Sequence, residues 1–175
     1  MTHVEPVKLG VRRFVAKPDI KHGITYSRTY GIPNHNDVLY IGAFVLDRPK
    51  EINKVISFWP NKFMHHVTLA YKPNQEFIDK MFIDEYIGQE YVIKIFKVIH
   101  DHLGCTAIVE YNGSCSVEDD LPYFYGEPHI TVGTAEGVKP FYSMDLIANY
   151  LGGDNDIFSA SMSFDVDVRV GIMLK

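Results

Sequence analysis

The last part of the chain alternates between apolar and polar residues over a long stretch. From Phe158 to Leu174 every even position is apolar, and every odd position as far as Arg169 is polar or charged. Because neighbouring side chains on a strand point to opposite faces, this pattern predicts a sheet with one buried and one exposed face. A straight strand of this length would extend on the order of 55 Å, wider than a compact domain, so we expect a bend, bulge or break.

The rest of the chain is predicted to mix strands and helices. Apolar runs of strand length, separated by Gly, Pro and Asn, occupy residues 38–46, 63–71, 89–101, 105–111 and 127–134. Apolar residues at helical spacing predict helices over residues 48–59, 75–87 and 140–151. In the last of these helices we expect one buried stripe, made of Phe141, Met144, Ile147, Ala148 and Leu151.

Length and composition indicate one soluble domain over residues 1–175. Hydrophobic residues make up 46% of the chain and charged residues 22%, which is typical of globular proteins. No segment approaches the roughly 18 uncharged apolar residues of a membrane span, so we expect a cytoplasmic protein with no membrane partner. The two cysteines, Cys105 and Cys115, are too few for a disulfide framework and are expected to be free thiols.

The charge distribution limits the possible partners. A formal net charge of -5 argues against a protein that grips long duplex nucleic acid through its phosphates, but it is compatible with a small anionic substrate. Residues 1–36 are punctuated by Gly, Pro and Asn and begin with an excess of Lys and Arg, so we interpret them as a basic N-terminal arm or extension. Such an arm either is simply solvated or meets a phosphate.

One short motif occurs twice. Residues 66–70 (HVTLA) and 129–133 (HITVG) both read His, β-branched, Thr, aliphatic, small. Each copy lies on a predicted strand that is followed by a turn and a helix, which indicates two copies of one supersecondary unit. We expect the small residues, Ala70 and Gly133, to leave room for a bulky ligand on the polar face of each strand.

Strand geometry turns this spacing into a candidate site. Residues two apart on a strand share a face, so His66 lies beside Thr68, and His129 beside Thr131. If the two units pack around a pseudo-twofold axis, all four side chains converge on one cleft. Two imidazoles can divide the acid and base roles of phosphoryl transfer, in either assignment, while the hydroxyls hold non-bridging oxygens. This scheme requires no metal ion and no cofactor.

Paired HxT motifs on strands, in a chain of this length, resemble the two-histidine (2H, LigT-like) phosphoesterase superfamily. The resemblance implies an α+β, bilobal fold, with two pseudo-symmetric antiparallel-sheet lobes and outer helices around a central cleft. It also implies metal-independent cleavage of phosphodiesters. The form of residues 66–71 (HVTLAY) is similar to the cyclic phosphodiesterase domains of fungal and plant tRNA ligases, which act on 2′,3′-cyclic phosphate ends of RNA.

Further residues are candidates for the same site. Tyr123 and Tyr125 adjoin the second HxT strand, where an aromatic ring can stack on a nucleobase, and we predict that they bind substrate. Their loop, residues 112–126, is a candidate lid. His65 is expected to face away from the site, as a structural or exposed residue. The pair His100 and His102 lacks the supporting ligands of a metal site.

Several functions remain open at this point. We predict a phosphodiesterase that opens a 2′,3′-cyclic phosphate of a small nucleotide or RNA end to a phosphomonoester. The alternative within this class is a viral or phage hydrolase that degrades cyclic oligonucleotide immune signals in the host cytoplasm. Two further alternatives are not phosphodiesterases of this kind. One is a nucleotide- or RNA-binding module that catalyses no reaction, and the other is a metallohydrolase that uses the histidines as metal ligands. The sequence predicts no oligomeric state.

Overall fold

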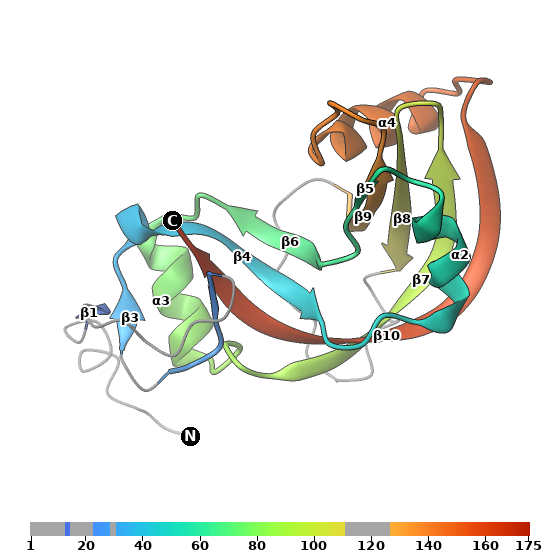
Figure 1. Cartoon of the computed structure of the whole chain (residues 1–175). Helices are drawn as coiled ribbons and strands as arrows, with labels where there is room; N and C mark the ends of the chain where they lie inside the picture. The colour runs from blue at the N-terminus through green and yellow to red at the C-terminus, as the bar shows by residue number, and fades with distance from the viewer. Residues whose placement is uncertain (1–12, 15–22, 29–30, 111–126) are drawn as a thin grey trace.

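The computed structural model describes residues 13–14, 23–28, 31–110 and 127–175 (Figure 1). The strands are β1 (Arg13–Phe14), β2 (Ile24–Thr25), β3 (Ile32–Pro33), β4 (Val38–Val45), β5 (Asn61–Lys62), β6 (His66–Tyr71), β7 (Glu90–His100), β8 (Gly104–Glu110), β9 (His129–Thr134) and β10 (Phe158–Leu174). The helices in these residues are the 3₁₀ turn η1 (His35–Asp37) and three α-helices, α2 (Lys50–Ser57), α3 (Gln75–Ile83) and α4 (Tyr142–Leu151). None of them has the length and apolar character that crossing a membrane requires.

The main sheet is antiparallel and closes on itself. Its strand order is β2-β10-β4-β6-β9-β8-β7, and a further pairing between β10 and β7 joins six of these strands into a ring. The expected α+β class, with antiparallel strands and helices on the outside, is therefore confirmed (Figure 1). The two expected lobes are not separate sheets. They are two halves of one sheet, because the long strand β10 pairs with β7 in one half and with β4 in the other.

Strand β10 carries the predicted alternation and bends as expected. Figure 1 shows it as a long curved strand that runs beneath both halves. Its pairing with β7 shifts register between Ser161 and Phe164, which is the expected irregularity. From Phe164 to Ile172 the even positions are buried, whereas Phe158 is 67% exposed. The predicted burial is thus wrong for the first residues of the strand, which project beyond the core.

Two elements begin or end earlier than the sequence pattern suggests. The predicted strand 63–71 starts only at His66, because Met64 has a φ of 70°, which breaks an extended strand. The predicted helix 75–87 ends at Ile83, and Glu85, with a φ of 62°, turns the chain toward β7. Residues 1–36, predicted as an arm or extension, contain the short strands β1, β2 and β3 in their described part.

Helix α4 buries a face that overlaps the predicted stripe only in part. Phe141, just before the helix, and Leu151, at its end, are each 66% exposed, so the stripe is wrong at both ends. Ile147 is buried as expected and packs with Leu146 in a small core cluster with β7 and β8, and Ser143 is also buried. The buried face thus includes a polar residue, which an apolar pattern alone does not identify.

Candidate active site

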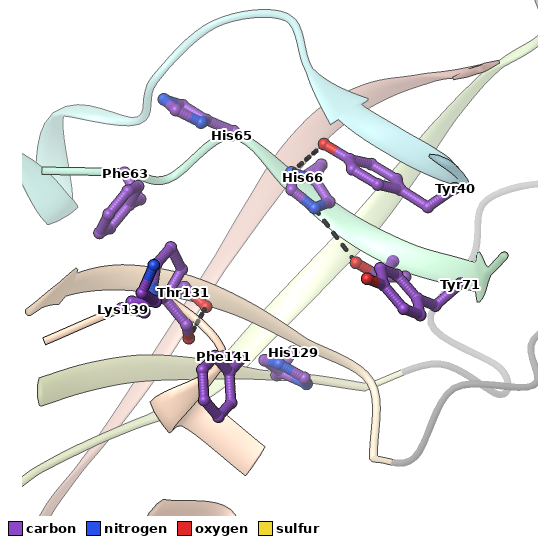
Figure 2. Close-up of a pocket in the computed structure, with 11 residues that line it drawn as sticks. Tyr40, Phe63, His65, His66, Tyr71, His129, Thr131, Lys139 and Phe141 are labelled. Atoms are coloured by element: carbon purple, nitrogen blue, oxygen red, sulfur yellow. Dashed lines mark hydrogen bonds between the residues drawn. The ribbon is translucent and has the colours of Figure 1, made fainter. Parts of the chain in front are cut away.

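The two strands that carry the HxT motifs pair with each other. Strands β6 and β9 are antiparallel, and Val67 lies opposite Ile130, with both side chains buried in the core. The HxT side chains point to the other face, where they line a cleft of about 410 Å³ (Figure 2). The lining residues are Tyr40, Phe63, His65, His66, Thr68, Tyr71, His129, Thr131, Lys139, Pro140 and Phe141.

The pairing of the two strands changes register next to the first motif. Val67 lies opposite Ile130, whereas the backbone N–H of Met64 donates to the carbonyl oxygen of Thr131 at 2.8 Å. The histidine and the threonine of each motif line the same cleft. This arrangement surrounds the middle of the cleft with two imidazoles and two hydroxyls.

His66 is held by aromatic rings and a hydroxyl. The ring of Tyr40 stacks on it, with 4.6 Å between centroids and 19° between planes. Burial raises the pKa of Tyr40 to about 12, so its hydroxyl keeps its proton and can donate to His66 Nδ1, 3.5 Å away. His66 Nε2 lies 3.1 Å from Thr68 Oγ1, a hydroxyl that can donate to the ring or accept from it (Figure 2). Tyr40 was missed by the sequence analysis, because its contact with His66 depends on the pairing of β4 with β6.

The surroundings of His66 disfavour its charged form. Burial is the main cause, and the neighbouring imidazoles of His65 and His129 add to it, so the pKa of His66 falls from 6.5 to about 3. In the free protein at neutral pH this ring is therefore uncharged.

A backbone carbonyl sets the tautomer of His129. Its Nδ1 lies 2.7 Å from the backbone carbonyl oxygen of Glu127. A carbonyl oxygen only accepts hydrogen bonds, so Nδ1 carries the proton of the neutral ring and Nε2 keeps a free lone pair. Burial lowers the pKa of His129, and the nearby Glu127 offsets part of that effect. The ring is 8% exposed.

Thr131 is anchored by the start of helix α4. Its hydroxyl lies 2.8 Å from the hydroxyl of Ser143 and donates to the carbonyl oxygen of Pro140 at 3.3 Å. Ser143 is 2% exposed and belongs to the first turn of α4. The sequence analysis missed Ser143, although a serine within an otherwise apolar helical stripe was an available signal.

The rim of the cleft adds residues that the motifs did not identify. Lys139 and Phe141 are exposed and flank the second motif, while Phe63 lies across from them (Figure 2). His65 is exposed, as expected, but it also lines the cleft, so the expectation that it faces away from the site is wrong. The reason is that His65 precedes β6 and follows the left-handed Met64, where strand alternation does not apply.

Gly133 does not serve the expected purpose. A Cβ atom at this position would lie 2.5 Å from Cβ and 2.6 Å from Cγ of Trp59. The space left by the missing side chain is therefore filled by the buried Trp59, which follows helix α2, rather than left open for a ligand.

Some predicted residues lie outside the described part of the chain. Tyr123, Tyr125 and the candidate lid 112–126 belong to this group, as does most of the basic arm. Arg28, a described residue of the arm, pairs with Glu85 at 3.2 Å.

The described residues do not include a group of three or more His, Cys, Asp or Glu side chains that could hold a metal ion. His100, from the HxH pair, stacks on Phe158 with 5.3 Å between ring centroids, and His102 is exposed. Cys105 is buried as a free thiol, and burial raises its pKa to about 12.

Comparisons with known proteins place the chain in a family. No curated protein matches it. The crystal structure of a fungal RNA kinase matches over 79% of this chain, with a TM-score of 0.51 and 11% sequence identity, which shows a shared fold. The chain spans 46% of that protein. The family model of the fungal tRNA ligase phosphodiesterase domain matches residues 54–170, more than half of the chain, including both HxT motifs. The chain therefore belongs to the fungal tRNA ligase phosphodiesterase domain family, a member of the 2H phosphoesterases.

Proposed function

We propose that this protein hydrolyses 2′,3′-cyclic phosphates at RNA ends to phosphomonoesters, using His66 and His129 as an acid–base pair. The observation that carries the proposal is the convergence of both HxT pairs on one cleft. Membership of the tRNA ligase phosphodiesterase family supports an RNA end as the substrate and favours it over cyclic oligonucleotide signals. The scheme uses no metal ion and no cofactor.

The tautomers suggest which histidine takes which role. His129 Nε2 has a free lone pair, because Nδ1 is bound to a carbonyl, so His129 is the better general base toward water. Water gives its proton to His129 as its oxygen bonds to phosphorus. The bond from phosphorus to one ribose oxygen breaks, and that oxygen takes a proton from His66, the other imidazole that lines the cleft.

His66 must first be protonated to act as a strong acid. A pKa of about 3 leaves it neutral in the free protein, but a cyclic phosphate placed between the rings brings a negative charge to within a few ångströms. An opposite charge at that range raises the pKa of an imidazole. Binding of the substrate thus recruits the proton that the leaving oxygen requires.

The threonine hydroxyls are proposed to hold the non-bridging oxygens. Thr131 can keep its contact with Ser143 while turning its proton from the long bond with Pro140 toward the phosphate. Thr68 is released when His66 donates to the substrate instead. Tyr123 and Tyr125 remain predicted substrate contacts.

We also infer that residues 1–175 form one domain whose two halves are pseudo-symmetric lobes around the cleft. In support, β6 is followed by a turn and α3, and β9 by a turn and α4, so each half carries the same strand, turn and helix order.

The test is hydrolysis of nucleoside 2′,3′-cyclic monophosphates, with the product identified by ³¹P NMR. We expect His66→Ala and His129→Ala each to lower kcat by a factor of about 10² to 10⁴ while the circular dichroism spectrum stays unchanged. His102→Ala, at an exposed position, is the matched control and should keep full activity. Full activity in either of the first two variants would refute the proposal.

Two further measurements separate the alternatives. Activity that survives EDTA contradicts a metallohydrolase. Binding of the cyclic nucleotide without release of product would identify a binding module. Faster cleavage of cyclic oligonucleotides than of cyclic monophosphates would favour the immune-signal substrate.

A further inference from the structure

A second cavity adjoins the active-site cleft. It has a volume of about 630 Å³, within the range of cavities that hold small ligands. Tyr40 and His65 line both cavities, so these two side chains form the boundary at which one space passes into the other. Figure 2 shows both at one edge of the cleft. The lining residues are Ile24, Tyr26, Tyr40, Phe44, Val45, Leu46, Arg48, Met64, His65 and Met173.

The register of the sheet places both cavities on one face. His66 on β6 is paired with Phe44 on β4, and Phe44 is paired with Arg169 on β10. Further along β10, Met173 is paired with Ile24 on β2. Since paired residues on neighbouring strands point to the same side, the catalytic face of β6 continues across β4 and β10 to β2. Three strand spacings cover about 14 Å, enough to extend a binding surface well beyond the catalytic cleft.

Two glycines shape the sheet beneath the second cavity. Gly42 on β4 lies opposite Gly171 on β10. A Cβ atom on Gly171 would lie 2.8 Å from Cδ1 of Tyr26, so this glycine lets the Tyr26 ring lie directly on the sheet. Arg169 stands 5.3 Å from the centroid of the same ring. Tyr26 is therefore fixed in place while remaining half-buried, with part of its ring available to a ligand.

The second cavity is lined by aromatic and apolar side chains and by one arginine, Arg48. Tyr26, Tyr40 and Phe44 form an aromatic wall. Arg48 is exposed at the rim, and no acidic side chain of the described residues pairs with it. Arg48 and His65 are close enough for the guanidinium to contribute to lowering the pKa of His65. Aromatic rings with a nearby guanidinium are the pattern that binds a nucleobase together with its phosphate.

We propose that this second cavity binds the nucleoside that precedes the cyclic phosphate in an RNA strand, with Arg48 contacting the phosphodiester that links it to the terminal nucleotide. The inference rests on the proposed function and narrows its substrate to oligonucleotide ends in preference to free nucleotides. The order of the sites across the sheet, catalytic cleft first and aromatic cavity next, matches the order of the last two nucleotides.

The experiment compares kcat/KM for a dinucleotide ending in a 2′,3′-cyclic phosphate with kcat/KM for the corresponding mononucleoside 2′,3′-cyclic phosphate. We expect the protein to prefer the dinucleotide. Arg48→Gln should lower that preference by about tenfold at low salt, the size of one charge-assisted hydrogen bond. Tyr26→Leu should also lower it, whereas Tyr26→Phe keeps the ring and the preference. Arg28→Gln, which removes a surface arginine paired with Glu85, is the matched control.

Equal efficiency on the two substrates, or a preference that Arg48→Gln leaves intact, overturns the inference. Calorimetric binding of a dinucleotide 3′-phosphate and a mononucleotide 3′-phosphate tests the cavity independently of turnover. If neither cyclic substrate is hydrolysed, the proposed function fails. A tighter dinucleotide complex that Arg48→Gln weakens still supports the cavity, and equal affinities refute it.

Discussion

The depressed pKa of His66 predicts a specific loss of stability in mild acid. In the unfolded chain this imidazole takes up a proton near pH 6.5, whereas in the folded protein it resists protonation until about pH 3. Between these values the unfolded state binds more protons, so the free energy of unfolding falls as the pH falls. The stabilisation from the neutral ring is present above pH 6.5 and is lost progressively below it.

The size of this loss of stability follows from how far the pKa of His66 is lowered. Each pH unit below 6.5 costs about 1.4 kcal/mol for one fully coupled proton, so lowering the pH from 7 to 5 removes about 2 kcal/mol through His66 alone. His129 and His65, whose pKa values are also lowered, add smaller losses of the same sign.

Urea unfolding of the protein and of His66→Asn at pH 7 and pH 5 measures this contribution. Asparagine has no proton to gain, so the variant should lose about 2 kcal/mol less than the wild-type protein over this interval. Carboxylates contribute equally to both proteins and cancel in the difference. His102→Asn, at an exposed position, should behave as the wild type does. An identical loss in wild type and His66→Asn would refute the argument that burial keeps this imidazole neutral.

Substitutions at three positions test the contacts around the motifs. Gly133→Ala should destabilise the protein by about 3 kcal/mol in urea unfolding, because the added methyl group clashes with Trp59. Ser143→Ala should lower kcat/KM about fivefold to tenfold, through loss of the partner of the Thr131 hydroxyl, and Ser143→Thr should restore part of it. Tyr40→Phe should retain most of kcat, since the hydroxyl contact is long at 3.5 Å, whereas Tyr40→Leu should not, because it removes the stacked ring.

The sequence predicted those features that depend on residues close together in the chain. The apolar runs identified β4, β7 and β8 closely, and the HxT spacing identified four side chains that share a cleft. The start of β6 was misplaced, because the left-handed backbone of Met64 leaves no trace in the alternation of side chains. That single residue also brought His65 to the rim of the cleft.

Features that depend on which strands pair could not be predicted from the sequence. Closure of the sheet requires β10 to pair with both β4 and β7, and nothing in an alternating pattern says which partners a strand will have. The same holds for Tyr40, which reaches the first motif only through the register of β4 with β6. The face of α4 was misread because two overlapping apolar stripes fit one helix, and tertiary packing selected the one that contains Ser143.

The geometry of the closed sheet accounts for the chemistry proposed for it. Strands β6 and β9 pair at Val67 and Ile130, and the core on one side of that pair fixes the side chains on the other. The imidazoles of His66 and His129 line one cleft, and burial lowers the pKa of both, so both rings favour the neutral form. In the proposed reaction, the charge of a bound phosphate offsets the cost of protonating His66, and the two histidines then act as an acid and a base.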